Sequence, residues 1–142
     1  MNEKFLTYLN PKLGFKILYP VGWYVIEENP NRVIFHSFGN ATMRIIVNNA
    51  SSNITGHDYA LKEINELRSF ASDLHVTGIT VGTSHLPGWS IDYIIPPSHH
   101  VIDTILLANG KQFTISYLVV AVKPHEVLKV MQTMLNSFQI IK

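Results

Sequence analysis

The chain has 142 residues, of which 46% are hydrophobic and 15% are charged, and its formal net charge is +1. This composition predicts a single globular domain spanning residues 1–142, and it excludes disordered and fibrous chains. The small net charge gives no general electrostatic reason to bind nucleic acid or an anionic membrane. Because the chain has no cysteine, disulfides, cysteine-ligated zinc, iron–sulfur clusters and thiol catalysis are all excluded.

The N-terminal ten residues lack the apolar core of a signal peptide, and no apolar run approaches the length of a membrane span. We therefore expect no membrane-spanning segment. The expected location is the cytoplasm, unless a leader precedes this chain. In that case the extracytoplasmic side of a membrane is favoured.

The first half of the chain predicts antiparallel strands. Residues 15–19 alternate apolar and polar side chains and are followed by a Pro-Val-Gly turn, so we expect a hairpin with residues 23–26. Further strands are predicted at 32–38 and 42–47. The short connections require antiparallel pairing in succession.

Two segments have the periodicity of amphipathic helices. The first has an apolar stripe preceded by a Thr55–Asp58 capping box; the second, from about 124 to 137, begins with proline. The first stripe comprises Leu61, Ile64, Leu67, Phe70 or Ala71, and Leu74. The second comprises Val127, Val130 or Met131, Met134 and Phe138.

Between the two helices, the sequence predicts a weak or edge strand at 76–86, a turn at Pro87-Gly88, a strand at 89–95 and a strong hairpin. The hairpin turns at Asn109-Gly110, which favours a type I′ turn and fixes the register. That register places Leu106 opposite Phe113, Thr104 opposite Ile115, and Ile102 opposite Tyr117. The opposite face, which carries Asp103, is expected to be only partly covered. The order of elements predicts an α+β domain.

The ordered set of motifs resembles the PsbP family. The matching segments are Gly14-Phe-Lys-Ile-Leu-Tyr-Pro with Gly22-Trp23, Tyr59-Ala-Leu, Asn109-Gly110-Lys111 with Phe113-Thr-Ile-Ser-Tyr117, and Met134-Leu-Asn-Ser-Phe138. The resemblance covers nearly the whole chain. It implies a Mog/PsbP-type α/β/α sandwich with a central antiparallel sheet of about six strands and flanking helices.

The resemblance also implies a non-catalytic domain that binds other proteins. In the family, PsbP is an extrinsic subunit of photosystem II that helps to retain calcium, and Mog-type proteins bind a nuclear GTPase. The implied partner is a protein in a larger, membrane-associated complex. Only about a dozen residues precede Gly14 here, whereas the role in plants depends on a longer N-terminal extension.

One cluster contains metal-ligand side chains that lie close in sequence: His99, His100 and Asp103. Imidazole and carboxylate are ligands of zinc, manganese and copper, so a divalent metal is the cofactor that these residues would hold. However, adjacent strand residues point to opposite sides, and the alternative interpretation is a solvated loop end beside an exposed carboxylate. On that interpretation the chain uses no cofactor.

No catalytic motif stands out. Ser90 and Asp92 lack the second glycine of a nucleophile elbow and fall in a strand. Trp23, Tyr24, Trp89 and Tyr93 form either core or a surface for a partner, and exposure of a tryptophan would favour the surface. We therefore predict no enzyme but a protein-binding domain. The alternative is a small-molecule or metal carrier with its site near His99, His100 and Asp103.

Overall fold

The computed structural model describes residues 4–37, 41–97, 99–120 and 124–141, with residues 124–127 described by their backbone only. In order along the chain, the elements are β1 (Phe5–Asn10), β2 (Phe15–Pro20), β3 (Tyr24–Glu28), β4 (Arg32–His36), β5 (Ala41–Asn49), α1 (Gly56–Leu67), β6 (Ser72–Val81), β7 (Leu86–Ile95), β8 (His99–Ala108), β9 (Lys111–Val120), α2 (Pro124–Ser137) and β10 (Gln139–Ile140). Phe38, which was expected to extend the strand from Arg32, lies outside the described residues.

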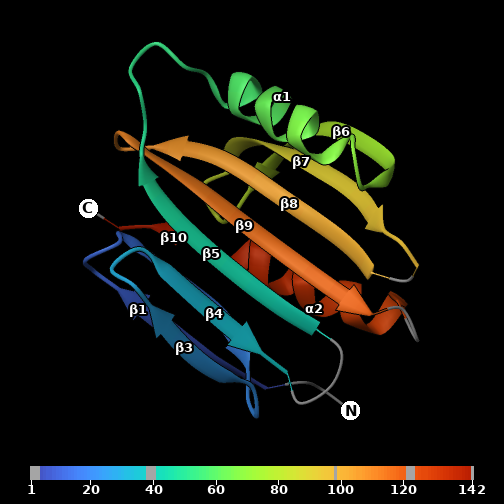
Figure 1. The fold of residues 1–142 in the computed structure, drawn as a ribbon. Coiled ribbons are helices and arrows are strands. Elements are labelled where there is room, and N and C mark those ends of the chain that lie inside the picture. Colours follow the sequence, from blue (N-terminus) through green and yellow to red (C-terminus); the bar gives the residue numbers. More distant parts are fainter. Residues whose placement is uncertain (1–3, 38–40, 98, 121–123, 142) are drawn as a thin grey trace.

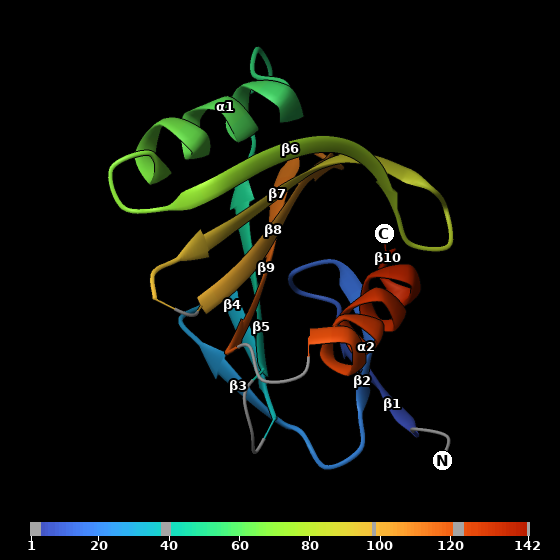
Figure 2. The same ribbon diagram turned by 90° about the vertical axis from the view of Figure 1, so that its right-hand side faces the viewer.

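Seven strands form one antiparallel sheet in the order β3-β4-β5-β9-β8-β7-β6. α1 lies on one side of this sheet, and α2 lies on the other (Figures 1 and 2). The register predicted for the β8–β9 hairpin is confirmed, since Leu106 pairs with Phe113, Thr104 with Ile115 and Ile102 with Tyr117. The predicted α+β sandwich is confirmed, with seven strands in its central sheet.

A second sheet of three strands, in the order β1-β2-β10, packs beside α2. The predicted hairpin between residues 15–19 and 23–26 is therefore wrong. β2 pairs with β1 and β10, while β3 begins the large sheet. The physical reason is the type of turn after Pro20. Gly22 has a φ of +96° at the third position and the Trp23 amide donates to the Pro20 carbonyl at 3.2 Å, as in a type II turn, which splays its flanking strands instead of pairing them.

The main core fills the space between the large sheet and the layer formed by α2 and the small sheet. Phe15, Phe113 and Phe138 meet at its centre with ring centroids 5.7 to 6.4 Å apart, and none is more than 1% exposed. The predicted α2 stripe is confirmed at Met131 and Met134, and Phe138, which directly follows the helix, is buried as predicted. Val127 lies outside the described side chains.

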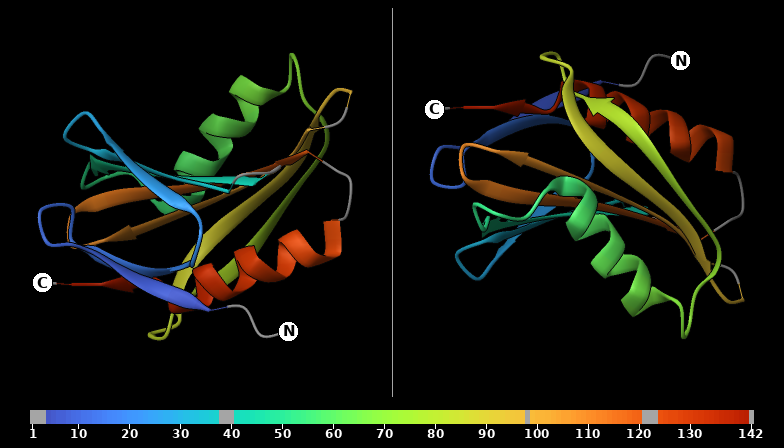
Figure 3. Two further views of the ribbon diagram at one scale, coloured as in Figure 1. Left: turned by 90° about the horizontal axis from the view of Figure 1, so that it is seen from below. Right: turned by 90° about the horizontal axis from the view of Figure 1, so that it is seen from above.

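α1 covers a second, smaller core over β7 and β8 (Figure 3). The predicted capping box is present, because the Thr55 hydroxyl accepts from the Asp58 amide and the Asp58 carboxylate accepts from the Thr55 amide. However, the helix ends at Leu67. Leu74 already belongs to β6, and Leu61 and Phe70 are exposed. The predicted stripe is therefore confirmed at Ile64 and Leu67 and is wrong beyond the helix end, because Leu74 of β6 continues the apolar spacing.

The turn between β6 and β7 lies at Gly82–His85, and Pro87-Gly88 belongs to β7. The predicted turn at Pro87-Gly88 is therefore wrong. Gly82 decides the position of the turn, because its φ is +79° and its Cα closely approaches the Phe138 carbonyl.

Neither described helix has the length and apolar composition that a membrane span requires.

Candidate functional site

A buried carboxylate lies beneath α1. Asp103, on β8, is only 4% exposed. Its Oδ2 accepts a hydrogen bond from the Tyr93 hydroxyl at 2.8 Å, and its Oδ1 accepts one from the Ser116 hydroxyl at 2.5 Å. The expectation of a solvated Asp103 is thus wrong, because α1 covers this part of the sheet and three neighbouring strands contribute to the site.

A second carboxyl group reaches Asp103 from the helix. Glu63 shares a side-chain hydrogen bond with Asp103, whereas the Oε2 atom of Glu63 is buried and has no hydrogen-bond partner among the described residues. Burial first, then the negative charge of Asp103, raises the pKa of Glu63 to about 8, although Arg44 opposes the shift. The buried site therefore favours the protonated form of Glu63 beside Asp103.

The same environment acts on the tyrosine. Burial, and then the charge of Asp103, raise the pKa of Tyr93 well above its ordinary value. Tyr93 therefore stays a neutral donor. Glu63, Asp103, Tyr93 and Ser116 form a buried polar cluster, which we call the polar lock, and it holds α1 on the sheet. Neither sequence periodicity nor any short motif indicated Glu63.

The three candidate metal ligands do not converge. His100 is paired with Asp92, with Nε2 and Oδ1 2.6 Å apart, whereas Asp103 lies on the opposite face of the sheet under α1. His99 has the strand parity of Asp103, but it lies four residues away from Asp103 along β8, where it pairs with Ile95 of β7. Within the ranges that the structure describes, no group of three or more acidic or histidine side chains could hold a metal ion.

Asp92 instead borders a groove between the sheet and α2. The groove has a volume of about 240 Å³. Its polar lining comprises Thr80, Ser90, Asp92, Thr104, Gln132 and Asn136, and its apolar lining comes from Ile79, Val81, Ile102, Met131 and Leu135. This mixture is typical of a site for a small polar molecule.

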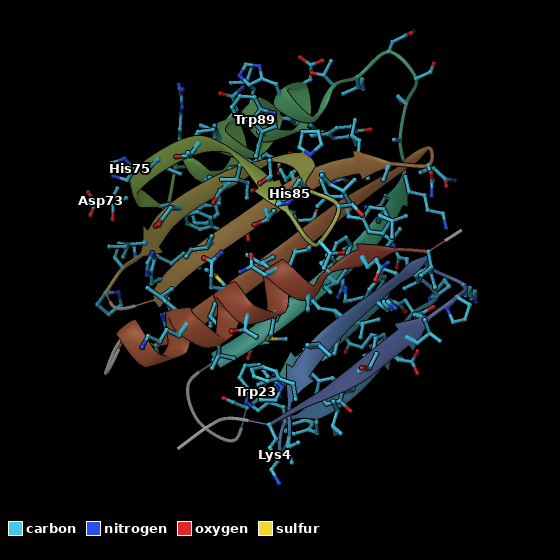
Figure 4. The ribbon with its side chains drawn as sticks, turned by 180° about the vertical axis from the view of Figure 1, so that it is seen from behind. Lys4, Trp23, Asp73, His75, His85 and Trp89 are labelled. Atoms are coloured by element: carbon cyan, nitrogen blue, oxygen red, sulfur yellow. The ribbon has the colours of Figure 1, made fainter. Side chains whose placement is uncertain are left out.

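The four aromatic candidates do not form one surface. Trp23 packs partly against the main core and Trp89 partly against the α1 core, at opposite ends of the molecule (Figure 4). Tyr93 is buried, whereas Tyr24 is 43% exposed and stacks on His36, with ring centroids 5.2 Å apart. Of the four, Tyr24 is the side chain most available to a partner.

Tyr24 belongs to a larger uncovered surface, which we call the open half. α1 lies over β7 and β8, so the same face of β3, β4, β5 and β9 carries no helix in the described chain (Figure 1). A shallow hollow of about 230 Å³ lies here. It is lined by Ile34, His36, Thr42, Arg44, Ser116 and Leu118, and strand parity places exposed Tyr24 and Ile26 beside it.

A wider hollow of about 710 Å³ lies where α1 begins. Trp89 forms one wall, with the His57 ring 4.6 Å from its own and Gly56 and Gly78 close to the indole. The indole is only partly buried here, so the hollow exposes apolar surface near the edge of the sheet.

The sequence matches no protein-family model, and no curated protein matches it. Solved structures do match. Cyanobacterial PsbP from Synechocystis sp. PCC 6803 has a TM-score of 0.68 at 17% identity, covering 99% of this chain and 94% of that one. The yeast Ran-binding protein Mog1p, from Saccharomyces cerevisiae, has a TM-score of 0.63 at 10% identity, covering 99% and 97%.

LpqN, described as involved in cell envelope biogenesis in Mycobacterium tuberculosis, has a TM-score of 0.63 at 11% identity, covering 99% of this chain and 91% of that one. All three matches span both helices and both sheets, because they cover nearly the whole chain. The domain therefore has the PsbP/Mog1 fold.

Proposed function

We propose that this chain is a non-catalytic protein-binding domain that contacts its partner through the open half. The observation that carries the proposal is the uncovered sheet surface, where Tyr24 and Ile26 stand exposed beside the hollow that Arg44 lines. Exposed aromatic and aliphatic groups around an arginine are typical of the centre of a protein–protein interface.

The chemistry of the buried groups also supports a binding role. Asp103 is sealed beneath α1, and both hydroxyl groups that touch it donate to it. Asp103 thus ties β7 and β9 to β8 beneath the helix, which is a structural role and fits a domain whose function lies on its surface.

The shared fold adds support from proteins of known description. Mog1p is a Ran-binding protein, and LpqN is involved in cell envelope biogenesis. We extend the proposal to a partner within a larger, membrane-associated assembly. A role at photosystem II, with calcium retention, is a prediction from the resemblance alone.

Affinity purification followed by mass spectrometry tests the proposal. The wild type should recover a defined partner, and Tyr24→Ala with Ile26→Ala should lower the recovery at least about tenfold. The matched control is Val21→Ala with Leu9→Ala, since these side chains are 51% and 56% exposed and lie outside the open half. Equal recovery of the partner by both double variants would show that the open half is not the contact surface.

A second candidate is a small-molecule or metal carrier, and the groove bordered by Asp92 favours it. His100 holds this carboxylate in place at 2.6 Å. A stoichiometric metal or small molecule that survives dialysis of the wild type, is lost in Asp92→Asn and is kept in Glu66→Gln would establish the carrier instead.

A further inference from the structure

β6 lies at the end of the large sheet. Among the described strands only β7 pairs with it, so its outer side carries a row of backbone groups without a strand partner. Seven of its ten residues are exposed. Figure 4 shows Asp73 and His75 at this border of the molecule. Such an edge is a template for another strand.

Two other edge strands, β3 and β1, carry charges or end early, whereas β6 has no such protection from Leu74 onward. β3, at the opposite edge, ends in Glu27-Glu28, and β1 has only six residues between Lys4 and Pro11-Lys12. From Leu74 to Val81, β6 contains neither proline, lysine, arginine nor a carboxylate. Charges and prolines are the usual means by which proteins prevent edge pairing, so their absence along eight residues is informative.

The α1 side of this edge is apolar. Glu63 lies near Asp103 of β8 and Arg44 of β5, so we infer that the other flank of the helix, which carries Leu61, faces β7 and the β6 edge. Leu61 is 45% exposed, and Val76 on β6 is 38% exposed. Two exposed apolar side chains thus lie on the α1 side of this edge.

We propose that β6 pairs with β6 of a second copy of this chain, so that two seven-stranded sheets join edge to edge. Antiparallel pairing of two identical strands has two-fold symmetry, so an unguarded edge is complementary to itself. No formal charge between Leu74 and Val81 opposes a like charge across the pair. The two-fold axis stands perpendicular to the sheet, which brings both α1 helices to the same face with their Leu61 flanks turned inward.

This proposal is independent of the open half, which lies toward the opposite edge of the same sheet, at β3. Analytical ultracentrifugation over a wide concentration range tests it with the purified chain. The wild type should change from the 16.1 kDa monomer to twice that mass as concentration rises. Val76→Lys places two lysines at the pairing edge and should raise the midpoint concentration at least about tenfold.

Leu6→Lys is the matched control, because Leu6 is 47% exposed on the edge strand β1, and it should leave the midpoint unchanged. Far-ultraviolet circular dichroism confirms that both variants fold. Hydrogen exchange should show β6 amides slowing as the wild type dimerises. A 16.1 kDa mass at every concentration, dissociation by Leu6→Lys but not by Val76→Lys, or a monomer that pairs β6 with an extended segment of another protein would each overturn the proposal.

Discussion

The carboxyl group of Glu63 makes the stability of the domain depend on pH. Its pKa is about 8 in the folded chain, above the ordinary value of 4.5, so the folded state binds more protons than the unfolded state between these values. The contribution of Glu63 is fully present below about pH 4.5 and is lost as pH rises toward 8. Glu63→Gln should flatten this decline and stabilise the domain by about 1–3 kcal/mol at pH 7.

Urea unfolding at pH 5, 7 and 8.5 measures the effect. Glu66→Gln is the matched control, since it removes an exposed carboxylate from the same helix. The prediction fails if the two variants have the same pH profile, because Glu63 would then ionise as an ordinary surface group.

Tyr93 tests the same lock from the sheet. Tyr93→Phe removes the donor to Asp103 Oδ2 and leaves a buried carboxylate oxygen without that bond. We expect a loss of about 1–3 kcal/mol in the free energy of unfolding. Tyr59→Phe is the control, because the Tyr59 hydroxyl only accepts an exposed bond from the Ser51 amide, and it should cost well below that range. Equal losses for the two variants would contradict the role assigned to Tyr93.

The sequence predicted only fragments of this site. Asp103 was identified as a candidate, yet its partners were sought at His99 and His100, close in sequence. The true partners come from α1, β7 and β9, and they depend on where the helix lies on the sheet. One signal was present: a carboxylate at the apolar parity of β8, between Val101 and Ile105, has to be buried with a partner.

At the scale of the element, the β6–β7 turn fixes the large sheet against the C-terminal segment. A Cβ built on Gly82 lies 2.0 Å from the Phe138 carbonyl oxygen, and the φ of +79° disfavours any side chain. Gly82→Ala should destabilise the domain by about 3 kcal/mol or more. Gly22→Ala, with a φ of +96° but no atom within 4 Å of its Cβ, should cost only the conformational part, about 1 kcal/mol.

Thermal and urea unfolding compare the two glycine variants. If Gly22→Ala costs as much as Gly82→Ala, the close approach to Phe138 contributes nothing and backbone conformation alone explains both losses.

Elements with strong local signals were predicted well. Asn109-Gly110 fixed the β8–β9 register, and Thr55 with Asp58 marked the start of α1, because both depend on neighbouring residues. Pairing that depends on distant residues was missed. β2 pairs with β10, more than a hundred residues away, and nothing in the local pattern of Gln139–Ile140 distinguishes a strand from a helix terminus.

At the scale of the whole molecule, Phe138 joins the two sheets. It is fully buried, stacks on Phe15 of the small sheet at 5.7 Å and meets Phe113 of the large sheet edge-on at the same distance. Phe138→Ala should therefore cost about 3–5 kcal/mol, because it removes an aromatic ring from the centre of the main core and leaves a cavity. Leu9→Ala, at a side chain 56% exposed, should change stability by less than about 0.5 kcal/mol.

The two sheets should also lose their structure together in Phe138→Ala. Hydrogen exchange of β2 and β9 amides, measured alongside urea unfolding, distinguishes a shared core from two separate ones. If the β2 amides exchange faster in this variant while the β9 amides keep their wild-type protection, the small sheet unfolds independently of the large one. Equal loss of protection in both strands is the result we expect, because Phe15 and Phe113 contact the same side chain and no independent core lies between the small sheet and α2 in the described residues.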